Sequence, residues 1–428
     1  MTQLKRMSLV SVAVCGLMAS TAVAQDGDFY SRDKYEAVMD RSQPKFDPEP
    51  VRLGAFLVDS SLQAGVTATD NALASSTNEE SDIVVRVGGA ASMRTNWAVH
   101  EIAADVSAFR NEYMDLSDES SNDLRARLRG RLDATREVSL NGSVFAEDRA
   151  EPRTALSDSI GLDRPVEFTR VGFTVGANYI NDRVRWENEA GWSESNYKDG
   201  KRVGTNINVD QDFRDRSEMM ARTRLSYAVT PDLAVYGQAT GRDLQYDQAQ
   251  LLGGDLRKRD SQGYTVAAGI DFELTSLVRG DVNVGFMNEN KDDPFFEDVD
   301  GLSVDGRMQW FPTRLTTVGF NASRRVVDVG VVQSPSAVQT SLGARVDHEL
   351  RRNIVLSAYG NLQDYDFEEI DRTDEVVDLG VSATYKMNKR VHFETFARHM
   401  ERDGSGVDSL AFDTFEVNQL GVGIKIYP

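Results

Sequence analysis

Four arginines recur at every second position of one short segment: Arg125, Arg127, Arg129 and Arg131. Residues two apart share one face of an extended strand, so the four guanidinium groups would form a row opposite alanine and leucine side chains. We call this row the arginine ladder. A row of fixed cations attracts anions and can select among the ions that pass it. Ion pairs that brace neighbouring strands are the alternative use, and the sequence leaves both interpretations open.

Carboxylates at matching positions accompany the arginine ladder. The preceding segment offers Glu101 and Asp105 with the same alternation, and a later segment adds Arg222 and Arg224. We expect all of these side chains to line one internal surface. Carboxylates near the arginines would offset the repulsion between like charges.

Other chemistries find little support in the sequence. The four histidines show no metal-protease spacing, and Gly404-Ser405-Gly406 lacks the strand–elbow–helix context of a hydrolase nucleophile. The only cysteine is Cys15, so we expect no thiol catalysis and no disulfide after residue 24. A formal charge of −20 argues against nucleic acid as a partner. We therefore expect a protein that is not an enzyme and that holds no cofactor or metal.

The elements that carry these residues are alternating strands. Apolar residues occupy every second position over 171–179, 264–272 and 377–385, with glycine and polar residues between them. About eighteen such segments (16–20 are possible) run from near Arg52 to Tyr427, joined alternately by short turns and longer acidic loops. This pattern predicts an all-β fold, a single transmembrane antiparallel up-and-down β-barrel with the ladder facing its lumen.

Aromatic residues recur at one height of this barrel, close to the short turns. An interfacial girdle of lipid-facing aromatics is typical of such barrels. The expected girdle residues are Tyr179, Trp186, Tyr227, Phe272, Trp310 and Tyr385.

The N-terminal region divides the chain further. Residues 1–24 begin with Lys5 and Arg6, continue through an apolar stretch and end in small residues, which predicts a secretory signal peptide. No later stretch is apolar enough for a spanning helix. We expect a periplasmic N-terminal segment at 25–51, a barrel at 52–428, and location in the cell outer membrane.

The entry to the barrel carries a resemblance. Asp40-Arg41, the proline-rich and acidic stretch 44–50, Arg52-Leu53-Gly54-Ala55-Phe56 and Asp70-Asn71 resemble the entry of a family of outer-membrane β-barrel porins of proteobacteria. Several members accompany exopolysaccharide or capsule export genes. The resemblance implies a conduit in polysaccharide export that docks a periplasmic polysaccharide export protein through 25–50. Tyr236, Tyr359 and Phe396, at lumen positions, would then stack on the glycan.

Two alternatives to export stay open. A general diffusion porin would fold loops inward, and the loops near 148–164 and 247–260 are long enough to do so. A structural envelope barrel would have a lumen closed by its own salt bridges. In each case the expected surroundings are outer-membrane lipid and lipopolysaccharide, with the barrel assembly machinery as a folding partner.

Overall fold

Long antiparallel strands make up most of the chain. The computed structural model describes residues 36–428 except 158–160, 276, 332 and 410–413, so the expected signal peptide lies outside the described residues. None of the helices in these ranges is long and apolar enough to cross a membrane. The elements are β1 (Val51–Leu53), β2 (Phe56–Thr69), β3 (Asp82–Thr95), β4 (Glu101–Tyr113), η1 (Ser117–Glu119), β5 (Ser121–Asp133), β6 (Val138–Ala150), β7 (Glu167–Asn181), β8 (Val184–Tyr197), β9 (Gly200–Lys201), β10 (Asn208–Val209), η2 (Asp212–Arg214), β11 (Arg216–Thr230), β12 (Leu233–Tyr246), β13 (Gln250–Leu252), β14 (Asp255–Arg257), β15 (Ser261–Leu274), β16 (Val278–Lys291), β17 (Val299–Thr313), β18 (Thr316–Asp328), β19 (Ser336–Arg351), β20 (Ile354–Phe367), β21 (Thr373–Lys386), β22 (Val391–Ser405) and β23 (Phe415–Ile426).

The main sheet closes on itself. Each long strand pairs antiparallel with the long strands before and after it in the chain, and β23 pairs with β2 over residues 62–69. This last ladder closes an antiparallel barrel of 18 strands. Closure pairs the backbone groups that two open edges would expose to lipid. The predicted all-β, up-and-down barrel is confirmed.

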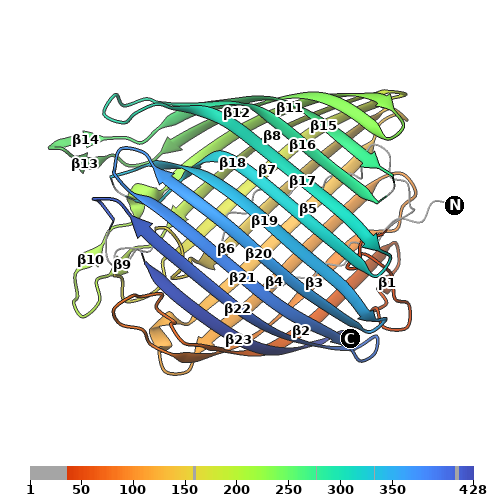
Figure 1. Ribbon diagram of the computed structural model, residues 1–428, viewed down its shortest axis with the longest axis horizontal. Coiled ribbons are helices and arrows are strands. Elements are labelled where there is room, and N and C mark those ends of the chain that lie inside the picture. The colour runs from red at the N-terminus through yellow and green to blue at the C-terminus, as the bar shows by residue number, and fades with distance from the viewer. Residues whose placement is uncertain (1–35, 158–160, 276, 332, 410–413) are drawn as a thin grey trace.

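The two ends of the barrel differ. Short turns join the strands at the end where β1 and the C-terminus lie, on the right of Figure 1. Long connections, two of which contain the small hairpins β9–β10 and β13–β14, lie at the opposite end. We call these the turn end and the loop end. In bacterial outer-membrane barrels the short turns face the periplasm.

The pleat of each strand decides which side chains face outward. Val175 of β7 and Val266 of β15 are 53% and 55% exposed although they are apolar. Such exposure is expected where a barrel presents an apolar band to lipid. Residues at the alternate positions, such as Thr174, face the lumen, where Thr174 Oγ1 lies 2.9 Å from Ser143 Oγ of the adjacent strand.

The segment before the first strand lies against the inner wall at the turn end. The buried amide of Val38 donates a hydrogen bond to Thr317 Oγ1 of β18 at 3.0 Å, and Arg41 forms a 2.8 Å ion pair with Glu349 of β19. Residues 36–50 therefore cross the inner faces of neighbouring strands and occupy part of this mouth. Two more ion pairs along the segment join Asp47 to Lys386 and Glu49 to Lys389.

Candidate functional site

β5 carries the arginine ladder on its inner face. Leu124, Leu128 and Leu132, at alternate positions of the same strand, are exposed on the outer surface, so the arginines between them face the lumen. At about 3.3 Å per residue, the ladder extends over roughly 20 Å of the strand. It therefore lines a continuous stretch of the lumen wall along β5.

Asp105 of β4 balances part of this charge. Its Oδ2 lies 2.7 Å from Arg129 Nη2, and Asp133, two residues further along β5, lies 3.2 Å from Arg131. Glu101 is opposite Arg131 in the strand register. No ion pair joins Glu101 and Arg131 among the contacts of the described residues. The structure thus brings Asp105 to the ladder and leaves Glu101 beside it.

The charges of the other two arginines of the ladder are not balanced by an ion pair in the described residues. Within the described ranges, Arg125 and Arg127 form no ion pair. Arg127 lies 5.7 Å from the centre of the Phe145 ring on β6, and Arg170 of β7 lies at the same distance. Aromatic rings hold guanidinium groups in this way without neutralising them. Phe145 is not among the residues that the sequence predicts to line the lumen. Residues 139–149 alternate between the two faces of the strand, however, and this alternation places Phe145 on the inner face.

Solvent reaches the ladder inside the barrel. The inward side chains of Arg129 and Arg131 are 40% and 41% exposed, which requires water-filled space beside β5. Two inward cations further around the barrel are covered instead, with Arg224 of β11 10% and Lys291 of β16 2% exposed. The lumen is therefore solvated along β5 and filled along part of the wall from β11 to β16.

Ion pairs fill the inner side of the wall from β11 to β16. Arg242 of β12 contacts Glu218 of β11 at 2.8 Å and Glu289 of β16 at 3.5 Å, and Lys291 contacts Glu289 at 2.6 Å. Buried charges are tolerated when paired in this way. Strand bracing is therefore the role of the charged residues here, in contrast to Arg125 and Arg127.

The structure separates Arg222 and Arg224 from the ladder. Both face inward on β11, but Arg224 is buried, with its guanidinium carbon 3.5 Å from the centre of the Tyr236 ring and an ion pair to Asp281. Arg222 is half-buried and, in the described part of the chain, forms no ion pair. Arg224 is thus a brace between strands, because its charge is neutralised and covered.

Three lumen aromatics lie against glycines of the next strand. A methyl group at each glycine would come within 2.2–2.3 Å of the neighbouring ring, so the rings lie close to the backbone. Tyr236 and Tyr359 also donate hydrogen bonds to Asp281 and Asp378. These contacts make the aromatics part of the wall. The ring–glycine pairs are Tyr236 with Gly269, Tyr359 with Gly380, and Phe396 with Gly421.

The connection between β6 and β7 narrows the lumen at the loop end. Its Glu151 pairs with Arg214 of η2, and the buried Arg214 also donates to Ser157 Oγ at 3.1 Å. Arg402 of β22 donates to the Ala155 carbonyl at 3.2 Å. Because β6 and β22 are far apart in the wall, these contacts require residues 151–157 to cross the lumen.

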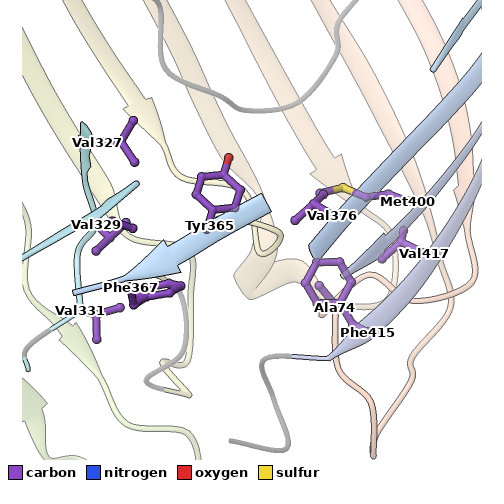
Figure 2. Packing of buried hydrophobic residues seen from close by; sticks show 11 residues of the cluster. Ala74, Val327, Val329, Val331, Tyr365, Phe367, Val376, Met400, Phe415 and Val417 are labelled. Atoms are coloured by element: carbon purple, nitrogen blue, oxygen red, sulfur yellow. The ribbon is translucent and has the colours of Figure 1, made fainter. Parts of the chain in front are cut away.

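An apolar cluster lies within the barrel at the same end. Figure 2 shows Val327, Val329 and Val331 beside Tyr365 and Phe367, with the rest of the cluster beyond them. Such a cluster inside a barrel that is otherwise polar excludes water locally. The other buried members are Ala74, Ala337, Val376, Met400, Phe415 and Val417.

The outer surface carries the aromatics expected to form a girdle. Trp186 and Trp310 are exposed, and Phe272 is half-buried on the same face of β15 as Val266. Trp186 donates its indole N–H to Thr223 Oγ1 at 2.9 Å. The remaining exposed members are Tyr179, Tyr227 and Tyr385.

Acidic groups of the loops lie apart from the ladder. Asp199, Asp210 and Asp212, in the connection from β8 to β11, have carboxylate oxygens within 4.8 Å of one another, close enough to share a cation. Glu369, between β20 and β21, accepts a hydrogen bond from the Glu297 amide at 3.1 Å. Burial raises the pKa of Glu369 to about 7, and the nearby Glu368 and Glu297 carboxylates add to this rise.

Comparison with known proteins identifies a family. Solved structures with a similar fold include the siderophore receptor PirA from Acinetobacter baumannii (7% identity, TM-score 0.48, 87% of this chain and 80% of that one) and the copper transporter OprC (10%, 0.48, 89% and 82%). The outer membrane protein OpdK from Pseudomonas aeruginosa is also similar (9% identity, TM-score 0.45, 87% and 99%).

No protein with curated information matches the chain significantly. The model of one family, described as "Putative beta-barrel porin 2", matches residues 43–427, which is nearly the whole barrel and the segment before it. The protein is located in the cell outer membrane. The chain belongs to the putative beta-barrel porin 2 family.

Proposed function

We propose that this protein is an outer-membrane channel through which small anionic solutes diffuse along the arginine ladder of β5. The observation that carries the proposal is a solvated row of incompletely balanced cations inside a closed barrel. Arg129 and Arg131 are 40% and 41% exposed, and Arg125 and Arg127 form no ion pair within the described residues. A fixed positive wall concentrates anions and depletes cations next to it.

The narrowing of the lumen supports small solutes as the cargo. Residues 36–50 occupy part of the turn end, and residues 151–157 cross the loop end. The paired charges of β11, β12 and β16 fill part of the lumen further around the wall. The solvated part of the lumen that a solute can follow includes the ladder.

Polysaccharide export, which the resemblance implies, has less support than diffusion of small anions. A glycan in export threads the lumen as a continuous polymer, and both inward segments would have to move aside for it. The aromatics suited to stacking on sugars are Tyr236, Tyr359 and Phe396, and each packs against a glycine of the neighbouring strand. A periplasmic export protein that docks through 36–50 would have to compete with the Arg41–Glu349 ion pair.

A structural barrel that moves nothing explains the braced wall but not the ladder. Bracing needs paired charges, as at Arg242 and Glu218. Like charges left unpaired cost assembly stability. Their retention at Arg125 and Arg127 is explained if an anion visits them. In the membrane, lipid and lipopolysaccharide would surround the outer face of the barrel. The barrel assembly machinery would insert the barrel into the membrane.

The experiment is ion selectivity of the purified protein in planar bilayers. Under a KCl gradient, the reversal potential should show that chloride permeates better than potassium, and small organic anions should permeate better than neutral sugars of equal size. Folded protein is identified first by heat-modifiable migration in detergent gels. Folded protein without conductance would overturn the channel and favour the structural barrel. Cation selectivity would overturn the role of the ladder.

A further inference from the structure

The barrel wall is interrupted between β17 and β18. Their ladder runs from the turn end to the pair Val304–Arg324 and stops there. Among the described residues, β17 continues to Val299 with β16 as its only strand partner, and β18 continues to Asp328 with β19 as its only strand partner. For about five residues at the loop end, therefore, the two strands do not pair with each other.

Beyond this point the hairpin lies inside the barrel. We call residues 325–331 and 334–339 the hairpin tip. Val338 of the tip shares a face of β19 with the lipid-facing Leu342, which is 54% exposed, yet Val338 is 5% exposed. It packs with Met287 and Val299, which face inward on β16 and β17. The same face of β19 contacts lipid at Leu342 and the inner side of the wall at Val338. This is possible only if the strand passes to the lumen side of β16 and β17.

Polar contacts fasten the hairpin tip across the lumen. The Asp328 carboxylate forms a 2.9 Å ion pair with Arg216 of β11 and accepts a hydrogen bond from the Tyr246 hydroxyl of β12. Arg259, just before β15, donates to the Val331 carbonyl at 3.3 Å. Arg216, Tyr246 and Arg259 belong to the wall that β18 would never reach if it followed the barrel. The opposite side of the tip joins the apolar cluster through Val327, Val329 and Val331, as Figure 2 shows.

The unpaired edge of β17 could form a strand ladder with residues 325–328 of β18. Continuing the observed register from Val304–Arg324 pairs Ser303 with Arg325, Leu302 with Val326, Gly301 with Val327, and Asp300 with Asp328. Val326 would then lie next to the exposed Leu302 on the lipid face, where an apolar residue belongs. Unpaired backbone groups at a strand edge are costly in a membrane, and this pairing would satisfy them.

We propose that the hairpin tip has two positions: the observed one, folded into the lumen and held by Asp328, and a second one in which residues 325–328 complete the wall against residues 300–303. The second position removes the tip and part of the apolar cluster from the loop end of the lumen. It therefore widens the passage. The consequence for permeation rests on the proposed function, whereas the movement itself does not.

The test uses cysteine pairs, since Cys15 is the only natural cysteine and lies in the predicted signal peptide. The pair Leu302→Cys with Val326→Cys can form a disulfide only in the wall-completed position, because in the observed one Val326 packs at the inner face and Leu302 faces out. Val304→Cys with Arg324→Cys, partners in the observed ladder, is the positive control. Leu302→Cys with Phe320→Cys lies out of register and is the negative control.

We expect slow but complete cross-linking of the 302–326 pair under mild oxidation of the folded protein in membranes. Adding Asp328→Asn removes the charge that binds Arg216 and should accelerate the cross-link about tenfold, because hydrogen bonds to charged groups are among the strongest. Failure of the 302–326 pair to cross-link, with or without Asp328→Asn, while the positive control cross-links fully, would overturn the two positions.

Conductance provides the second measurement. The oxidised 302–326 variant should conduct more than its reduced form in bilayers, and the oxidised positive control should not differ from its reduced form. Cross-linking with unchanged conductance would leave the movement established and would overturn its effect on the passage. A channel that does not conduct in any form would count against the proposed function alone.

Discussion

Reversing the free charges of the ladder should reverse the ion selectivity of the channel. The variant is Arg125→Glu with Arg127→Glu, chosen because neither arginine forms an ion pair in the described residues, so neither substitution breaks one. Arg110→Glu is the matched control. Arg110 lies on the adjacent strand β4 but is exposed and pairs with Glu112 at 2.7 Å on the outer face.

The expected size follows from Coulomb's law. An ion about 8 Å from a guanidinium in water gains or loses about 0.5 kcal/mol, and screening at 0.15 M salt reduces this to about 0.2 kcal/mol. Reversing two arginines changes the fixed charge by four units, so an anion loses about 0.8 kcal/mol and a cation gains as much. The permeability ratio should change by about 1.6 kcal/mol, or roughly 15-fold.

Salt dependence makes the assay decisive. At 0.01 M the Debye length is about 30 Å, and the change in the permeability ratio should exceed about a hundredfold. Reversal potentials in planar bilayers measure this ratio at both salt concentrations, and the Arg110→Glu control should stay within about twofold of the parent. A ratio that does not change in the double variant, or that changes equally at both salt concentrations, would refute electrostatic selection by the ladder.

Three further predictions concern stability and pH. Val266→Arg places a cation on the lipid face and should lower the free energy of unfolding by about 2–4 kcal/mol in vesicles, and a change below about 0.5 kcal/mol would show that Val266 does not face lipid. Phe415→Ala empties part of the apolar cluster at the loop end and should cost about 3–5 kcal/mol in urea unfolding, whereas Phe415→Leu should cost less than half of that. The pKa of Glu369 is about 7 against an ordinary value of 4.5, so the folded loops hold its proton more tightly than the unfolded chain does. Their stability should therefore decline as pH rises from about 4.5 through 7. Amide exchange of the two linked loops, corrected for intrinsic rates, should show protection falling between pH 5 and 8, and Glu369→Gln should abolish the fall; equal protection in both proteins at both pH values would contradict the role of Glu369.

Local residue patterns were enough to predict the strands and their faces. A strand has a period of two, so the alternation around Val175 and Val266 reveals both the strand and its lipid-facing side without knowledge of its partners. The same rule placed the ladder on one face of β5 and Asp105 on the matching face of β4. The short turns and long connections followed from where the alternation stops.

Ion pairs were harder to predict because register alone does not determine them. Arg131 lies opposite Glu101, yet its partner is Asp133 on its own strand. Asp105 pairs with Arg129 although Arg127 is its register neighbour. Long side chains reach diagonal positions, and the choice among them depends on the surrounding space. Arg224 shares the parity of a lumen residue but is covered, because Tyr236 of the next strand lies over it.

The sequence by itself determined the class of fold, the strand faces and the row of cations on β5, because each depends on the periodicity of a single strand. Only the tertiary structure decided which part of the lumen holds water. That division depends on contacts between strands far apart around the barrel, such as Asp328 with Arg216 and Arg402 with the Ala155 carbonyl. The inward position of the β18–β19 hairpin tip also depends on contacts between distant strands. The alternation of its residues fits a position in the wall and a position in the lumen equally well, so the period of the strand does not distinguish them. Contacts with strands across the barrel determine which position is adopted.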